Sequence, residues 1–187
     1  MAPCPHITTL GKLLRDTSRR YRLHEVFRDF CELTALSISN AVDTSQFEAR
    51  EARYLDIIRR YQRSEVDAFP QMLGLLVQSL EARFHDALGA LFMDLELGDH
   101  WKGQFFTPYE LASFMARLTL GDVRPQVEAR GFIAINEPAC GAGAMVIACA
   151  DAMLSQDVNY QQAMHVTAQD IDLTACHMAY IQLSLLH

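Results

Sequence analysis

The sequence predicts an α/β protein in which a helical N-terminal domain precedes a domain of alternating parallel strands and helices. Up to about residue 100, apolar residues recur at the three- and four-residue spacing of amphipathic helices. From Gly131 onward, short apolar strands alternate with helical segments, which indicates βαβ units with right-handed crossovers in a parallel sheet. We therefore expect two domains, residues 1–100 and residues 101–187.

Two segments of the first domain carry clear helix signals. In SQFEAREARYLDIIRRYQR, Ser45 and Glu48 have the spacing of a capping box ahead of an amphipathic helix. The segment FPQMLGLLVQSLEARFHDALGALFMDLEL continues the helical pattern, with Pro70 near a helix start and Gly98 after the end. This domain is predicted to be a helical bundle.

The second domain begins with another helix signal and then alternates. Thr107, Pro108 and Glu110 have the types and spacing of an N-cap, an N1 proline and a capping-box glutamate. FIAIN and HVTAQD are predicted strands, and GAMVIACADAML and LTACHMAYIQLSLL are predicted helices. Asp172 is expected to be the N-cap of the last helix.

The composition is that of a globular protein, with 50% hydrophobic and 21% charged residues. No apolar run approaches the roughly 18 residues that span a bilayer, and the N-terminus has no signal-peptide core. We expect a cytoplasmic protein without membrane association. The five cysteines are scattered without C-x-x-C spacing, so neither a disulfide framework nor a metal site is predicted. Cys140 lies in a glycine-containing turn without an evident base, which favours packing over a catalytic thiol.

The charge pattern restricts how this chain could bind nucleic acid. Its formal net charge is −7, and no Lys or Arg follows Arg130. Domains that grip nucleic acid usually show a concentrated basic face. Arg59, Arg60 and Arg63 alternate with acidic residues, which favours a solvated helix face over a nucleic-acid patch. If the protein acts on DNA, most DNA contacts are expected to lie elsewhere.

The stretch EPACGAG places two glycines in a strand-to-helix turn. Gly141 and Gly143 stand where the backbone must approach a ligand closely. The dinucleotide fingerprint needs another glycine three residues after Gly143, but Val146 is there. The absence of G-K-[ST] excludes a phosphate-binding P-loop. A nicotinamide-dependent enzyme is therefore a disfavoured alternative.

Two acidic residues accompany this turn. Glu137 at the end of the first strand would repel a phosphate but suits a ligand with a positive centre. S-adenosylmethionine has two positive centres, an ammonium and a sulfonium. Asp170 closes the next strand, where its two oxygens can accept hydrogen bonds from both ribose hydroxyls.

Three segments, in order, resemble a known family. GQFFTP at 103–108, NEPACGAGAM at 136–145 and AQDID at 168–172 are similar to segments of the adenine-N6 DNA methyltransferases, especially the modification subunits of type I restriction systems. The resemblance implies a helical domain followed by a Rossmann-like, S-adenosylmethionine-dependent methyltransferase domain, of which residues 101–187 would be the first half. Glu137 stands where the family more often has aspartate.

The resemblance also implies roles for individual residues in binding S-adenosylmethionine. The segment around Pro108 would contact the methionine end, with the helix N-terminus facing its carboxylate. Asp170 would bind the ribose, and Ile171 would pack on the adenine. The residues nearest the methionine end would be Phe105, Phe106 and Thr107, and the turn beneath it would comprise Glu137, Pro138, Ala139, Gly141 and Gly143.

Adenine methylation in this family uses an Asn/Asp-Pro-Pro-aromatic tetrad that holds the amine of a flipped-out base. No such tetrad follows Asp170, so no catalytic residue is assigned and this chain alone is expected to be inactive. The resemblance implies that family members continue beyond the position of His187 towards a third strand and the tetrad; whether the natural form of this chain does so is left open. DNA is expected to be bound through regions mostly absent here, and a partner subunit or self-association is a further candidate interaction. Two alternatives stay open: a non-catalytic cofactor-binding or protein-interaction module, and a methyltransferase acting on RNA or protein.

Overall fold

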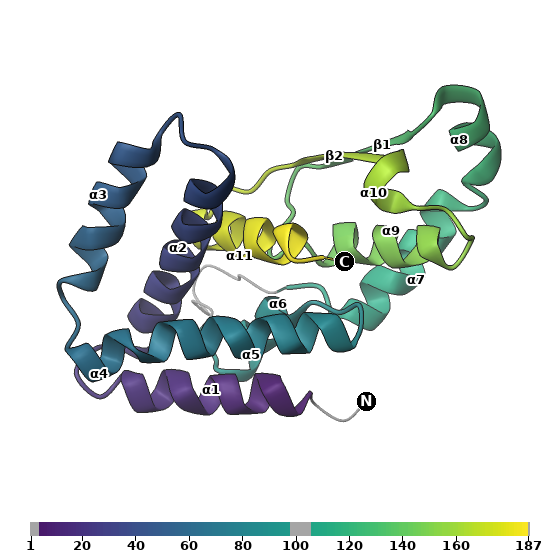
Figure 1. Cartoon of the computed structure of the whole chain (residues 1–187). Coiled ribbons are helices and arrows are strands. Elements are labelled where there is room, and N and C mark those ends of the chain that lie inside the picture. The colour runs from purple at the N-terminus through teal and green to yellow at the C-terminus, as the bar shows by residue number, and fades with distance from the viewer. Residues whose placement is uncertain (1–3, 98–105, 187) are drawn as a thin grey trace.

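The structure, a computed structural model, describes residues 4–97 and 106–186. It is mostly helical with one small parallel sheet, which is consistent with the predicted α/β class. Helices α1 and α5 lie side by side at one end of the molecule and the strands run along the other (Figure 1). Within the described ranges, no helix has the length and apolar character needed to cross a membrane. The helices before residue 98 are α1 (Pro5–Thr17), α2 (Leu23–Val42), α3 (Phe47–Ile58), α4 (Arg63–Val66), α5 (Ala68–Ala82) and α6 (Ala87–Asp94).

A shared apolar core holds these helices together. Leu10 and Leu14 of α1 recur at four-residue spacing and are completely buried, as are Met72 and Leu76 of α5. Each helix therefore turns one apolar stripe towards the other. The helical bundle predicted from the periodicity of this region is the arrangement observed.

Two predicted helix boundaries in this region are wrong. The capping box of Ser45 and Glu48 does not form, since α3 begins at Phe47 and the N–H of Ser45 donates to Asp43 Oδ1 at 2.9 Å. The local turn made by the aspartate takes the backbone group that a cap would have used. The long segment after Pro70 is interrupted at residues 83–86 and forms α5 and α6. Gly98 lies outside the described residues.

The predicted cap at Thr107 is also wrong. Helix α7 (Tyr109–Leu120) has Pro108 as its N-cap, and no side chain caps it. The Pro108 carbonyl accepts from the N–H groups of Leu111 and Ala112, both at 3.0 Å. The helix thus starts one residue later than predicted.

The sheet follows the prediction. Strand β1 (Ile133–Glu137) pairs in parallel with β2 (Met164–Ala168), and the intervening chain crosses over through helices. The N-cap role of Asp172 is confirmed, since its Oδ1 accepts from the N–H of Thr174 at 2.7 Å. The remaining helices are α8 (Arg124–Arg130), α9 (Ala144–Leu154), α10 (Tyr160–Ala163) and α11 (Leu173–Ser184).

The apolar core continues across the predicted domain boundary near residue 100. Helix α11 packs against α2 and α6, and its Met178 and Ile181 are completely buried in the same cluster as Phe27 and Phe30. Ala142 of the glycine-containing turn belongs to that cluster as well. The helices before residue 98 therefore form the support on which the turn and α11 rest.

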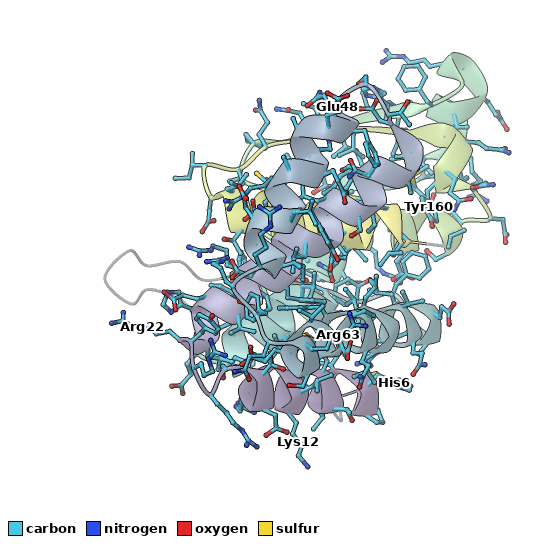
Figure 2. The ribbon with its side chains drawn as sticks, turned by 60° about the vertical axis from the view of Figure 1, so that its left-hand side comes forward. His6, Lys12, Arg22, Glu48, Arg63 and Tyr160 are labelled. Atoms are coloured by element: carbon cyan, nitrogen blue, oxygen red, sulfur yellow. The ribbon has the colours of Figure 1, made fainter. Side chains whose placement is uncertain are left out.

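The arginines of the α3–α4 region do not form a free basic patch. Arg59, Arg60 and Arg63 each make an ion pair with an aspartate. Lys12 and Arg22 point outward elsewhere on the helical region (Figure 2). This pairing supports the solvated helix face. The pairs are Arg59 with Asp56 at 3.5 Å, Arg60 with Asp29 at 2.6 Å and Arg63 with Asp67 at 3.2 Å.

Candidate functional site

The chain between β1 and α9 forms a turn that is fixed to the end of β2. Beyond the paired strands, Gln169 donates its N–H to the Glu137 carbonyl at 2.9 Å and accepts from the N–H of Cys140 at 2.8 Å. The N–H of Gly143 then donates to the Cys140 carbonyl at 2.8 Å, which closes the turn before α9. These backbone bonds help to hold residues 137–143 at the carboxyl end of the sheet, where ligands bind in open α/β sheets.

The turn requires glycine at two positions, for different structural reasons. Gly141 has a φ of +53°, and a Cβ there would lie 2.8 Å from Cδ1 of Phe106. Gly143 has a φ of +96°, and a Cβ would come within 3.5 Å of the Ala179 Cα on α11. The first glycine admits an aromatic ring against the turn, and the second lets α9 begin close to α11.

Asp170 connects the end of β2 to the glycine turn. Its Oδ2 accepts from the N–H of Gly141 at 2.8 Å, and its Oδ1 accepts from the N–H of Asp172 at 2.9 Å. An ionised carboxylate has about four acceptor positions, so both oxygens can accept further bonds. Ile171, the next residue, is an apolar side chain left fully exposed at 106%. Together they present a fixed acceptor pair beside an uncovered apolar surface.

These elements surround a cavity of about 700 Å³, within the usual range for small-molecule and cofactor sites. Three of the described lining residues are carboxylates, and none of the described ones is Lys, Arg or His. Such a lining favours a ligand with positive charge. The lining residues are Asp86, Phe106, Thr107, Ala139, Cys140, Gly141, Ala142, Ala144, Met145, Asp170, Ile171, Asp172 and Leu173.

The cavity gathers six of the site residues proposed from the sequence. Of those it does not include, Glu137 directs Oε1 at the N–H of Ala139, 3.3 Å away, so its carboxylate closes its own turn. Phe105 lies outside the described residues. The six that line the cavity are Phe106, Thr107, Ala139, Gly141, Asp170 and Ile171, and the four described ones that do not are Pro108, Glu137, Pro138 and Gly143.

Asp86 is the lining residue that the sequence reading missed most completely. It precedes α6 and is only 3% exposed, and its carboxylate accepts from the N–H of Gly89 at 2.8 Å as an N-cap. Burial raises its pKa. An aspartate directly before an apolar segment is an N-cap signal. This signal predicts that a new helix begins after Asp86, so that the long helical segment is divided there. The other lining residues not proposed are Cys140, Ala142, Ala144, Met145, Asp172 and Leu173.

Gln182 of α11 joins Asp86 to the glycine turn. Its side chain is completely buried, and its Nε2 donates to Asp86 Oδ1 and to the Ala142 carbonyl, both at 2.8 Å. Its Oε1 accepts from the N–H of Leu88 at 3.0 Å. Every polar atom of this buried amide is therefore bonded, and it fixes α6 and the turn relative to each other.

Cys140 is not poised as a nucleophile. Burial, reinforced by the nearby Asp170 charge, raises the pKa of its thiol to about 11. The thiol stays protonated at neutral pH, whereas a reactive cysteine needs thiolate character. Its Sγ lies 3.6 Å from the Gly141 carbonyl, as suits a small packing residue inside the turn.

Comparison with known proteins relates this part of the chain to a family. The family model described as N-6 DNA Methylase matches residues 95–187. No curated protein and no solved structure matches the chain. Within the described residues, no group of three or more His, Cys, Asp or Glu side chains could hold a metal ion. The match covers the glycine turn, Asp170 and all of the described cavity lining except Asp86, and residues 95–187 are therefore similar to the N-6 DNA methylase family.

Proposed function

We propose that this chain carries the S-adenosylmethionine site of a Rossmann-like adenine-N6 DNA methyltransferase of the restriction-modification type. The observation that carries the proposal is the acidic cavity between Phe106, the glycine turn and Asp170. Among the described lining side chains, a nucleotide phosphate would meet three carboxylates and no cationic group. A cofactor with an ammonium, a sulfonium, a ribose and an adenine matches the groups present.

The residues of the cavity fit the parts of this cofactor. Asp170 keeps acceptor capacity for the two ribose hydroxyls while its backbone bonds fix its orientation. Ile171 offers an uncovered apolar surface for the adenine ring. Phe106 and Thr107 directly precede the N-cap of α7, whose N-terminal N–H groups suit the methionine carboxylate.

When bound, S-adenosylmethionine supplies an electrophilic methyl group. The contribution of this chain is to hold that cofactor in one orientation, so that an adenine amine can approach the methyl group in line. The backbone-fixed turn and the Asp170 carboxylate provide this orientation without rearrangement. The groups that would hold the adenine are not assigned to residues of this chain.

We assign most DNA contacts to parts of the assembly outside this chain. This assignment is supported by the net charge of −7 and by the aspartate pairing of Arg59, Arg60 and Arg63. Phosphate binding needs available basic residues. We place the activity in the cytoplasm, where S-adenosylmethionine and chromosomal DNA of a restricting cell are both present.

Calorimetric titration of the 187-residue chain with S-adenosylmethionine, S-adenosylhomocysteine and NAD tests the cofactor assignment. We expect saturable binding of the first two and none of NAD. Asp170→Ala should weaken both by roughly tenfold or more, because it removes charged acceptors for two hydroxyls. Asp56→Ala, at an exposed aspartate of α3, serves as the matched charge control. Preferential NAD binding, or equal affinities in wild type and Asp170→Ala, would refute the proposal.

A further inference from the structure

One cavity residue comes from outside the family match. Among the described lining residues, Asp86 alone belongs to the region before residue 98. It lies at the start of α6, and the Phe92 ring of that helix packs edge-on against Phe106 with centroids 4.9 Å apart. The helical region thus reaches the cavity beside the aromatic residue that covers the glycine turn.

The Asp86 carboxylate is held in place through one of its oxygens. Oδ1 accepts both hydrogen bonds, from the N–H of Gly89 and from Nε2 of Gln182. Gly89 leaves room for the carboxylate, since a Cβ there would collide with it. In the described part of the chain, no hydrogen bond reaches Oδ2 and no cationic side chain pairs with Asp86. Asp86, a residue only 3% exposed, therefore lines the cavity with Oδ2 lying against Gly89 and making no hydrogen bond to a described residue.

A cation in the cavity would stabilise the ionised form of this buried carboxylate. Burial raises the pKa of Asp86 because the ionised form loses hydration. Nothing among the described lining side chains offsets the charge, since Asp170 and Asp172 are also carboxylates. A positively charged N–H donor inside the cavity would make a charge-assisted hydrogen bond and favour the ionised form.

The two acids are connected to adjacent residues of the glycine turn. Asp170 binds the N–H of Gly141 directly, and Asp86 is connected to the Ala142 carbonyl through Gln182. Asp170 is already assigned to a ribose. Asp86 is then left to bind the positively charged hydrogen-bond donor of the cofactor. A sulfonium carries no N–H group, so the donor is the protonated amine.

We propose that Asp86 is a cofactor-binding residue contributed by the helical region, and that its Oδ2 accepts a hydrogen bond from the protonated amine of the methionine moiety. This assignment rests on the proposed function. The helical region is then part of the cofactor site, because it supplies one of the groups that bind the ligand.

Asp86→Asn removes the negative charge while keeping the hydrogen bonds that the fold uses. The asparagine carbonyl can still accept from Gly89 and Gln182, while an NH₂ group replaces Oδ2. Asp94→Asn removes the same charge from an exposed position at the end of α6 and serves as the control. Thermal unfolding of both variants verifies that the fold is retained.

Two probes then separate the amine from the rest of the ligand. S-adenosylhomocysteine has the amine, and 5′-methylthioadenosine retains the adenine, ribose and thioether but lacks it. We expect Asp86→Asn to weaken S-adenosylhomocysteine binding by roughly tenfold or more and to leave 5′-methylthioadenosine affinity unchanged, with no effect of Asp94→Asn on either. Equal effects on both probes, or no effect on either, would overturn the Asp86 assignment alone. Failure of the wild-type chain to bind either probe would overturn the proposed function and this assignment with it.

Discussion

Gln182 and Asp86, 96 residues apart in the sequence, are joined by a 2.8 Å hydrogen bond between Nε2 and Oδ1. The same amide nitrogen also binds the Ala142 carbonyl in the glycine turn. A buried amide with all its positions bonded holds its partners in one geometry, and its loss leaves each partner without a bond. The position of the turn therefore depends on the helical region.

Replacing Gln182 with leucine should destabilise the protein. The substitution keeps a similar volume but leaves Asp86, the N–H of Leu88 and the Ala142 carbonyl without a bond they make in the native fold. We expect the free energy of unfolding to fall by about 3 kcal/mol, measured by urea denaturation. Gln162→Leu, at an exposed position on α10, should change it by less than about 0.5 kcal/mol. Equal stability of the two variants would contradict the role given to Gln182.

Gly141→Ala should impair both stability and cofactor binding. An alanine at a φ of +53° costs about 1–2 kcal/mol, and its Cβ would displace the Phe106 ring from the turn. Gly131→Ala imposes a comparable backbone cost, at a φ of +82°, with nothing within 4 Å of the added Cβ. In denaturation and S-adenosylmethionine titrations, both variants should lose stability, but only Gly141→Ala should lose affinity. Loss of affinity in both would mean that Phe106 placement is not the cause.

Ile171→Ala should separate ligand binding from folding. The side chain is fully exposed, so its truncation should change the free energy of unfolding by no more than about 0.5 kcal/mol. If the adenine covers it, S-adenosylmethionine affinity should fall by roughly threefold to tenfold because apolar contact is lost. Val42→Ala removes another exposed aliphatic side chain, at the last residue of α2, and should leave the S-adenosylmethionine affinity unchanged. An unaltered affinity in Ile171→Ala would remove Ile171 from the site.

His85 should make the stability of the fold depend on pH. Burial lowers its pKa below its usual value, and the ring is bonded to Ser79 Oγ and to the Arg83 carbonyl, both at 2.9 Å. The unfolded chain takes up a proton near pH 6.5 while the folded chain still resists it. The His85 contribution is therefore lost as pH falls below about 6.5, by at most roughly 1.4 kcal/mol per pH unit.

The comparison that checks this is His85→Gln against wild type in urea denaturation between pH 5 and pH 7. Because burial also raises the pKa of Asp86, with the opposite effect on the slope, the difference between the two proteins is the informative quantity. The variant should show a smaller loss of stability on acidification. His24→Gln, at an exposed histidine, should keep the wild-type slope. Identical slopes in His85→Gln and wild type would contradict the assignment.

The elements that the sequence predicted correctly are those that local chemistry determines. The parallel strands follow from short apolar runs, and the Asp172 cap follows from an aspartate placed before an apolar helix. The Ser45 cap failed because the Asp43 carboxylate binds the Ser45 N–H, and the Thr107 cap failed because α7 begins one residue later, with Pro108 as its N-cap. Spacing alone does not show which of several adjacent polar groups takes a free N–H.

The site was partly predictable for the same reason. Phe106, Gly141 and Asp170 belong to motifs that lie within or beside the turn, and the structure brings them together at one cavity. Asp86 precedes the turn by more than fifty residues and reaches it only through the packing of α6 and α11. A contact between residues so far apart in the sequence produces no local sequence pattern. The only local indication was the N-cap aspartate between α5 and α6.

A crystal structure of the chain grown with S-adenosylmethionine or S-adenosylhomocysteine tests the cofactor site most directly. We predict ligand density in the cavity between Phe106, the glycine turn at Gly141 and Asp170, with the ribose hydroxyls on the Asp170 carboxylate. Density for the ligand at another position, or an empty cavity at saturating ligand concentration, would contradict this prediction.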